Sequence, residues 1–210
     1  MSDVKRPSKR TQKAQETRRR ILEAAQELFV RDGYGATNLQ DVAELAGVAV
    51  QTIYFVFGNK RALLKELVDV TIAGDDAPVA TMERPWYTGA LAAETAEDLL
   101  LAYVAGTTTV LERVAPIGRM LEAAGASDPE VSALWSFDVD PRYTVQQHTA
   151  ESLVGKPDAR AGLSAEEAAD VLFGLLSPEL YLLFVQERGW SRERWEQWAW
   201  STLRAQLCLQ

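Results

Sequence analysis

The side chains between positions 37 and 60 are of types that recognise double-stranded DNA. Gln can hydrogen-bond to adenine edges in the major groove, and Thr or Val can contact thymine methyl groups there. Thr, Tyr and Lys can bind phosphates, which fixes the register on the duplex without reading its sequence. The candidate DNA-contacting residues are Thr37, Ala49, Val50, Gln51, Thr52, Tyr54, Phe55 and Lys60. We therefore expect a DNA interface in this segment.

Positioning these side chains requires two short helices joined by a tight turn. With Leu39 as the first position, Ala43 is small enough for the second helix to cross closely, and Gly47 permits a positive φ in the turn. Apolar residues stand where the pair must pack on neighbouring helices: Val42, Val48, Ile53 and Val56. The pattern predicts a helix-turn-helix whose second helix enters the major groove. A generic helical hairpin is the alternative.

Further helices flank this pair. Apolar residues recur at Ile21, Ala25 and Phe29, which is one face of an amphipathic helix. Thr37 is expected to cap the next helix in a capping box, with Gln40 reaching back. The chain after residue 90 predicts helices near 94–114, 116–124, 129–137, 141–154, 164–188 (kinked at Pro178) and 191–207. The expected fold class is all-α.

Charge divides the chain into a basic head and an acidic body. Residues 1–20 carry eight basic and two acidic side chains, whereas residues 66–210 have a net charge of −13. A basic end attracts polyanions such as DNA, and an acidic body is repelled by them; a merely solubilising tail is the alternative. We expect a basic, disordered arm at 1–13, a DNA-binding domain at 14–62 with a connecting helix at about 60–73, and a helical ligand-binding and dimerisation domain at 74–210.

The acidic body offers candidates for a small-molecule pocket, which is typically apolar with a few polar groups. The candidate lining residues are Trp86, Tyr103, Thr107, Met120, Trp135, Phe137 and His148. Core or surface positions are the alternative for each of them. Arg119 or Arg142 could meet an acidic ligand, with a surface ion pair as the alternative.

Several function classes are excluded by composition and motifs. The single His and the single Cys, Cys208, rule out an HExxH motif, a Cys-based zinc site and an internal disulfide. Neither GxSxG nor GxGxxG occurs, so we expect no enzyme and no cofactor or metal. The N-terminus lacks the apolar region of a secretory signal, and no stretch reaches the roughly 18–20 apolar residues of a membrane span. We expect a cytoplasmic protein without a membrane partner.

Sequence motifs in residues 17–64 are typical of one family. They comprise Ile21–Ala25, Leu28–Phe29, Gly33–Tyr34, Thr37, Val42–Ala43, Ala46–Val48, Thr52–Tyr54, Phe57 and Lys60–Leu64. This segment resembles the TetR family of bacterial transcriptional regulators. The resemblance implies that residues 50–57 form the recognition helix, that Thr52, Tyr54 and Lys60 contact phosphates, and that Val50 and Gln51 face bases. Ala49 and Val56 depart from the Ser/Thr cap and the His that are common there, which leaves the operator sequence open.

The resemblance also implies an oligomeric state and a mode of action. The two last helices, about 164–188 and 191–207, would pair with their mates in a homodimer that binds a palindromic operator. Burial of these helices within one subunit is the alternative. An unknown small-molecule ligand would release such a repressor from DNA. A ligand-responsive activator, or a helical scaffold protein without specific DNA binding, are the alternative functions.

Overall fold

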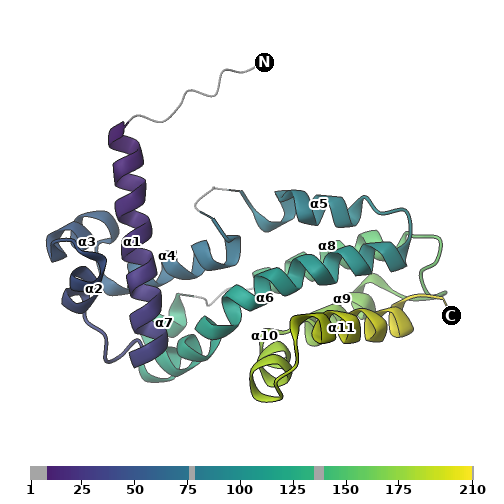
Figure 1. Ribbon diagram of the computed structural model, residues 1–210. Coiled ribbons are helices and arrows are strands. Elements are labelled where there is room, and N and C mark those ends of the chain that lie inside the picture. Colours follow the sequence, from purple (N-terminus) through teal and green to yellow (C-terminus); the bar gives the residue numbers. More distant parts are fainter. Residues whose placement is uncertain (1–8, 76–78, 135–139, 210) are drawn as a thin grey trace. The chain divides into compact units, whose positions relative to one another are not determined.

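The computed structural model describes residues 9–75, 79–134 and 140–209, and within these ranges every regular element is a helix (Figure 1). The all-α class expected from the sequence is confirmed. The elements are α1 (Lys9–Asp32), α2 (Leu39–Ala46), α3 (Val50–Phe57), α4 (Lys60–Ala73), η1 (Thr81–Glu83), α5 (Pro85–Leu91), α6 (Ala96–Ser127), α7 (Pro129–Ala133), α8 (Pro141–Val154), α9 (Ala165–Leu175), α10 (Pro178–Tyr181), η2 (Leu182–Glu187) and α11 (Arg192–Leu207).

The chain folds as two compact units, each with its own core. Unit 1 comprises Met1–Asp69 and Arg119–Trp135, and unit 2 comprises Val70–Gly118 and Ser136–Gln210. This division differs from the boundary expected near residue 74, because the last part of α6 and all of α7 belong to unit 1. Trp135 is also outside the described residues, as are residues 1–8.

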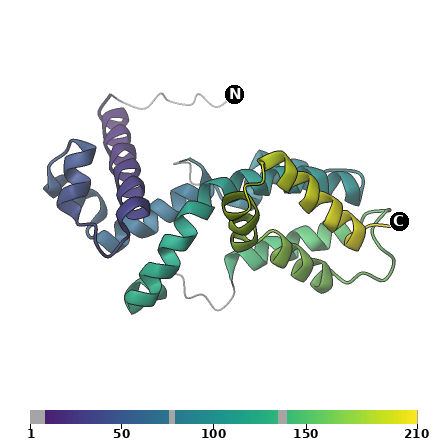
Figure 2. The ribbon, with the colours of Figure 1, turned by 60° about the horizontal axis from the view of Figure 1, so that its bottom comes forward.

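In unit 1, α1 lies beside α2 and α3 in both views (Figure 1, Figure 2). Ile21, Ala25 and Phe29 are fully buried at the predicted helical spacing. The helix begins at Lys9, so the expectation of a disordered arm is wrong for residues 9–13. These residues are Lys, Arg, Thr, Gln and Lys, mostly good helix formers, and they extend a helix that is already nucleated.

Asn38, and not Thr37, caps α2. The Asn38 Oδ1 accepts hydrogen bonds from the backbone N–H groups of Gln40 and Asp41, both at 2.9 Å, and the Asp41 carboxylate accepts one from the Asn38 N–H. The Thr37 side chain is buried, and its hydroxyl donates to the Gly33 carbonyl at 3.0 Å. The predicted capping box is therefore wrong by one residue, because the end of α1 already occupies the Thr37 hydroxyl.

Removing this cap should destabilise the protein. Asn38→Ala is expected to lower the free energy of unfolding by about 0.5–2 kcal/mol, because it leaves two N–H groups of α2 without a partner. Urea denaturation followed by circular dichroism measures the change, and Asn38→Asp should retain most of the stability. The matched control is Gln40→Ala, an exposed position of the same helix turn, where a change of at most about 0.5 kcal/mol is expected. Equal losses at the two positions would contradict the capping role.

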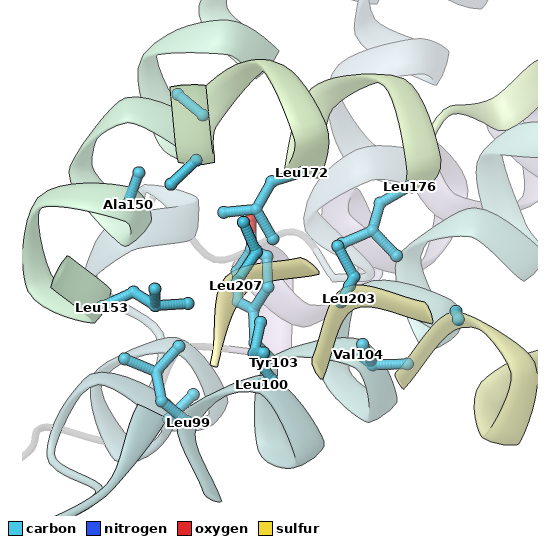
Figure 3. Close-up of a cluster of buried hydrophobic side chains, with 14 of the residues drawn as sticks. Leu99, Leu100, Tyr103, Val104, Ala150, Leu153, Leu172, Leu176, Leu203 and Leu207 are labelled. Atoms are coloured by element: carbon cyan, nitrogen blue, oxygen red, sulfur yellow. The ribbon is translucent and has the colours of Figure 1, made fainter. Parts of the chain in front are cut away.

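The core of unit 2 joins four helices that are distant in sequence. Figure 3 shows this cluster. Its labelled side chains come from α6 (Leu99, Leu100, Tyr103, Val104), α8 (Ala150, Leu153), α9 (Leu172, Leu176 at its C-cap) and α11 (Leu203, Leu207). Each is buried.

Two helix boundaries in the body differ from the prediction, both at a proline. Pro116 lies inside α6 instead of separating two helices; its neighbours Ala115 and Ile117 are buried, and their packing outweighs one lost backbone hydrogen bond. Pro178 does the opposite: α9 ends at Leu175, and Pro178 begins the separate helix α10 instead of kinking one long helix. Ser177 caps α10 by accepting from the Leu180 N–H at 3.2 Å, and Pro178 occupies the first helical position, where no N–H is needed.

In the described part of the chain, residues 165–187 are long and apolar enough to cross a membrane, judged by length and hydropathy alone. The structure divides this stretch into α9, α10 and η2. Buried side chains from it, such as Leu172, Tyr181 and Leu182, belong to the core of unit 2. A core segment of this kind is expected to be strongly apolar.

Candidate nucleic-acid interface and ligand pocket

The turn between α2 and α3 depends on Gly47 and on a clamp from α1. Gly47 has a φ of 64°, the left-handed conformation that glycine adopts without strain. The Arg20 side chain donates hydrogen bonds to the Ala46 carbonyl and, at 3.1 Å, to the Gly47 carbonyl. A Cβ at Gly47 would stand 2.9 Å from Arg20 Nη2. Arg20 therefore holds the carbonyl end of α2, a role that the sequence analysis missed.

The recognition helix has one buried and one exposed face. Ile53 is buried in unit 1, as predicted, and Phe57 is buried as well, whereas the predicted packing residue Val56 is only partly buried. Gln51 is exposed, and the Tyr54 and Phe55 side chains are 54% and 91% exposed. Gln51 and Phe55 are four residues apart and so share one side of the helix. The cap residue Ala49 makes no side-chain hydrogen bond, in line with the missing Ser or Thr. The geometry leaves amide and aromatic groups available to a major groove.

Part of the basic head serves the structure of unit 1. Arg18 pairs with Glu66 and lies 5.2 Å from the centroid of the Phe57 ring. Arg19 pairs with Glu16 and Glu23 at 2.7 and 2.6 Å, and its hydrogen bond lowers the pKa of Glu16. Charge counted along the sequence therefore overstates the charge available to DNA. The exposed basic residues at the start of α1 are Lys9, Arg10 and Lys13.

The predicted DNA-contacting residues do not all reach the surface. Six of them, Ala49, Val50, Gln51, Thr52, Tyr54 and Phe55, lie on α3 or at its cap. Thr37 is 3% exposed and its hydroxyl is bonded internally, so it does not present a phosphate ligand. Lys60 begins α4 with its Nζ 4.1 Å from the centroid of the Tyr34 ring, and burial lowers its pKa.

Unit 2 contains a cavity of about 240 Å³. Three predicted lining residues, Trp86, Tyr103 and Thr107, do line it. Met120 lies in unit 1, and the exposed His148 has its Nδ1 2.9 Å from the Tyr87 hydroxyl oxygen; neither lines the cavity. Trp135 and Phe137 fall outside the described residues. The lining residues that sequence analysis did not propose are Ile72, Thr81, Val110, Leu111, Val114, Pro141, Val145, Gln146, Leu176 and Pro178.

Most of these additional lining residues could have been predicted from their helical spacing in the sequence. On α6, the lining residues 103, 107, 110, 111 and 114 recur every three or four positions, and on α8 residues 142, 145 and 146 do the same. Arg142, which the sequence singled out as a possible contact for an acidic ligand, is among them.

One glycine shapes the cavity wall. A Cβ at Gly106 of α6 would stand 2.1 Å from Cε3 of Trp86, so only glycine allows the indole ring to lie against this helix. The ring centroid of Trp86 is 6.2 Å from that of Tyr103. The Tyr103 hydroxyl donates to Gln146 Oε1 at 2.9 Å, and burial raises the pKa of Tyr103 to about 12. The phenol therefore stays protonated at neutral pH.

No group of three or more His, Cys, Asp or Glu side chains is placed to hold a metal ion in the described part of the chain. The described geometry is that of a helix-turn-helix with an exposed second helix and a separate, mostly apolar cavity. A cavity of this kind, mostly apolar with a few polar groups, is typical of small-molecule binding sites.

Comparison with known proteins agrees with this geometry. The sequence profile of bacterial regulatory proteins of the tetR family matches residues 21–67. The chain is 48% identical over 58 residues to the HTH-type transcriptional regulator TtgR of Pseudomonas putida, and the match spans 28% of either chain. The aligned part thus covers under a third of that relative.

Solved structures match the fold over most of the chain. A transcriptional regulator from Saccharomonospora viridis in complex with choline matches 93% of this chain and all of its own, with a TM-score of 0.67 and 19% identity. The regulator FadR of Bacillus subtilis in complex with stearoyl-CoA matches 88% of this chain and 96% of its own, with a TM-score of 0.65 and 18% identity. Residues 21–67 thus match the tetR family of bacterial regulatory proteins, and the chain as a whole shares the fold of these solved structures.

Proposed function

We propose that this protein is a cytoplasmic transcriptional regulator, a homodimeric repressor that binds a palindromic operator and is released by a small-molecule ligand. The observation that carries the proposal is the exposed face of α3, with Gln51, Tyr54 and Phe55 outward on a helix held by buried Ile53 and Phe57. Such a helix fits the major groove. The family relationship of residues 21–67 supports the same interpretation.

The ligand-binding part of the proposal rests on the cavity in unit 2. Its lining includes Ile72 of α4 and several residues of α6, and both helices continue along the chain into unit 1. A ligand that binds one conformation of these helices better than another would change the affinity for DNA, and it can do so only through that difference in affinity. The relatives solved with choline or stearoyl-CoA support a ligand site in this fold.

Dimerisation is proposed through the segment from α9 to α11. Leu183 of η2 is exposed, and η2 and α11 contribute aromatic side chains that are partly exposed in the single chain. Two such surfaces related by a two-fold axis would form a four-helix interface. Two helix-turn-helix units would then read the two half-sites of a palindrome.

Selection of duplexes from a random pool, followed by fluorescence anisotropy at several salt concentrations, tests DNA binding. We expect enrichment of a palindrome and a linear fall of log affinity with log salt, with a slope of about −0.9 for each phosphate neutralised. Failure of the purified protein to bind any duplex at low salt, or a strictly monomeric state in sedimentation, would overturn the proposal.

Two substitutions on α3 should separate base reading from phosphate contact. Gln51→Ala is expected to cost about 1–3 kcal/mol on the selected operator and to relax the preference at one base pair. Tyr54→Ala should weaken binding to every duplex by a similar factor, because a phosphate contact carries no sequence information. Affinities for the operator and its single-base variants measure both effects. A uniform loss for Gln51→Ala would show that this side chain does not read a base.

A further inference from the structure

The polar groups around the cavity of unit 2 include several that can donate hydrogen bonds. Tyr103 donates to Gln146 Oε1, which leaves the amide N–H groups of Gln146 as donors. Thr107 is 9% exposed, lines the cavity, and its hydroxyl has no hydrogen-bond partner among the described residues. A buried hydroxyl without a partner carries a free-energy cost that a bound ligand can remove. These groups favour a ligand with acceptor oxygens.

Arg142 adds a positive charge to the same wall. Its Nη1 donates to the Phe173 carbonyl at 2.8 Å, and its Cζ lies 3.5 Å from the centroid of the Phe173 ring. Among the described residues, no carboxylate lies within ion-pair distance of its guanidinium. The nearby Asp140 carboxylate instead accepts a hydrogen bond from the Arg142 backbone N–H at 2.8 Å. Asp140 and Glu179 interact with the Arg142 guanidinium only through electrostatic attraction at longer range. The half-buried guanidinium, whose pKa burial lowers, still has unused N–H donors.

The remaining lining limits the size and charge of the ligand. Arg142 is the one charged side chain of the described lining, so a single negative charge can be balanced there. The rest of the wall is mainly apolar and includes Trp86, Tyr103 and Val110. A cavity of about 150 Å³ holds benzene, and this cavity measures about 240 Å³. It therefore has room for one or two rings, or for an aliphatic body of that size.

We infer that the cavity of unit 2 binds a monocarboxylic acid with a compact, aromatic or branched apolar body of about 10–14 non-hydrogen atoms. Arg142 binds the carboxylate, Thr107 and Gln146 donate to its oxygens, and Trp86 contacts the apolar body. This inference names the ligand class of the proposed function and rests on it. A quaternary ammonium compound, which two aromatic rings also suit, would face the charge of Arg142.

Isothermal titration calorimetry with matched probes tests the ligand class. The probes are 4-isopropylbenzoate and naphthalene-2-carboxylate, the neutral amide of each, and choline. At neutral pH we expect at least one acid to bind about ten- to a hundredfold more tightly than its amide, the range of a hydrogen bond to a charged group. Choline should bind more weakly than that acid. If no acid is preferred over its amide, the inference is overturned.

Variants locate the effect at the cavity. Arg142→Gln should abolish the preference for the acid while leaving the affinity for the amide within about threefold, and Arg142→Lys should restore part of the preference. Gly106→Ala should weaken acid and amide alike, because its Cβ displaces Trp86. Glu151→Gln, an exposed position on α8, is the matched control and should change neither affinity. Equal loss of acid and amide binding in Arg142→Gln, with an unchanged circular dichroism spectrum, would contradict the inference.

The same titrations distinguish this inference from the proposed function. Release of the protein from its selected operator by the preferred acid, measured by anisotropy, supports both. If choline or an amide releases the protein from DNA and acids are not preferred, the inferred ligand class is overturned, whereas the proposed regulatory function still holds. If the protein binds an acid tightly through Arg142 but binds no duplex, the inferred ligand class is supported and the proposed regulatory function is overturned.

Discussion

Replacing Ile53 by alanine should lower the free energy of unfolding of unit 1 by about 2–5 kcal/mol. The Ile53 side chain is 0% exposed and is the central apolar contact of α3 with the helices beneath it. Its removal leaves a cavity that a short helix without a side-chain N-cap cannot easily close. Chemical denaturation measures the loss, and binding of the operator should fall with it.

Phe55→Ala is the matched control for this prediction. Phe55 lies two residues further along the same helix and is 91% exposed, so its loss should change stability by at most about 0.5 kcal/mol. It should nevertheless weaken operator binding if the ring contacts the groove. A large loss of stability in Phe55→Ala, or a small one in Ile53→Ala, would show that the two faces of α3 are assigned wrongly.

Replacing Trp195 by alanine should destabilise unit 2 by about 3–5 kcal/mol. The ring is fully buried, with centroids of Tyr181 at 5.3 Å and of Trp198 at 5.2 Å. Trp195→Phe should cost much less, because the buried Nε1 has no hydrogen-bond partner among the described residues and its removal loses no bond. Thermal or chemical unfolding followed by circular dichroism gives the comparison.

The control in unit 2 is Leu101→Ala on α6. Leu101 is an exposed apolar residue in the single chain, and its truncation should change the stability of the monomer by at most about 0.5 kcal/mol. If Trp195→Ala were no more harmful than Leu101→Ala, the aromatic cluster around Trp195 would not be part of the core.

The helix-turn-helix could be predicted from sequence because its determinants are local. Periodic apolar residues define the buried faces of α1 and α3, and Gly47 marks a turn that needs a positive φ. The exposed face of α3 follows directly, since the residues that do not pack must point outward. The same local reasoning placed the cap of α2 one residue too early, because Thr37 and Asn38 are both good caps.

Only the tertiary structure decided which charges and which pocket residues are available. Arg18, Arg19 and Arg20 count as basic residues in the sequence, yet each contacts a group within unit 1. Pro116 and Pro178 differ in effect because burial around the first outweighs its missing hydrogen bond, while Ser177 provides a new cap for the second.

The cavity itself could not be derived from periodicity alone. It exists where faces of α6 and α8 meet, with Trp86 admitted by Gly106 and Arg142 turned toward the same space. Spacing along one helix identifies a face, but the partner of that face is chosen by packing between residues that are distant in the chain. Local sequence thus determined the exposed helix α3, and long-range packing determined the cavity of unit 2.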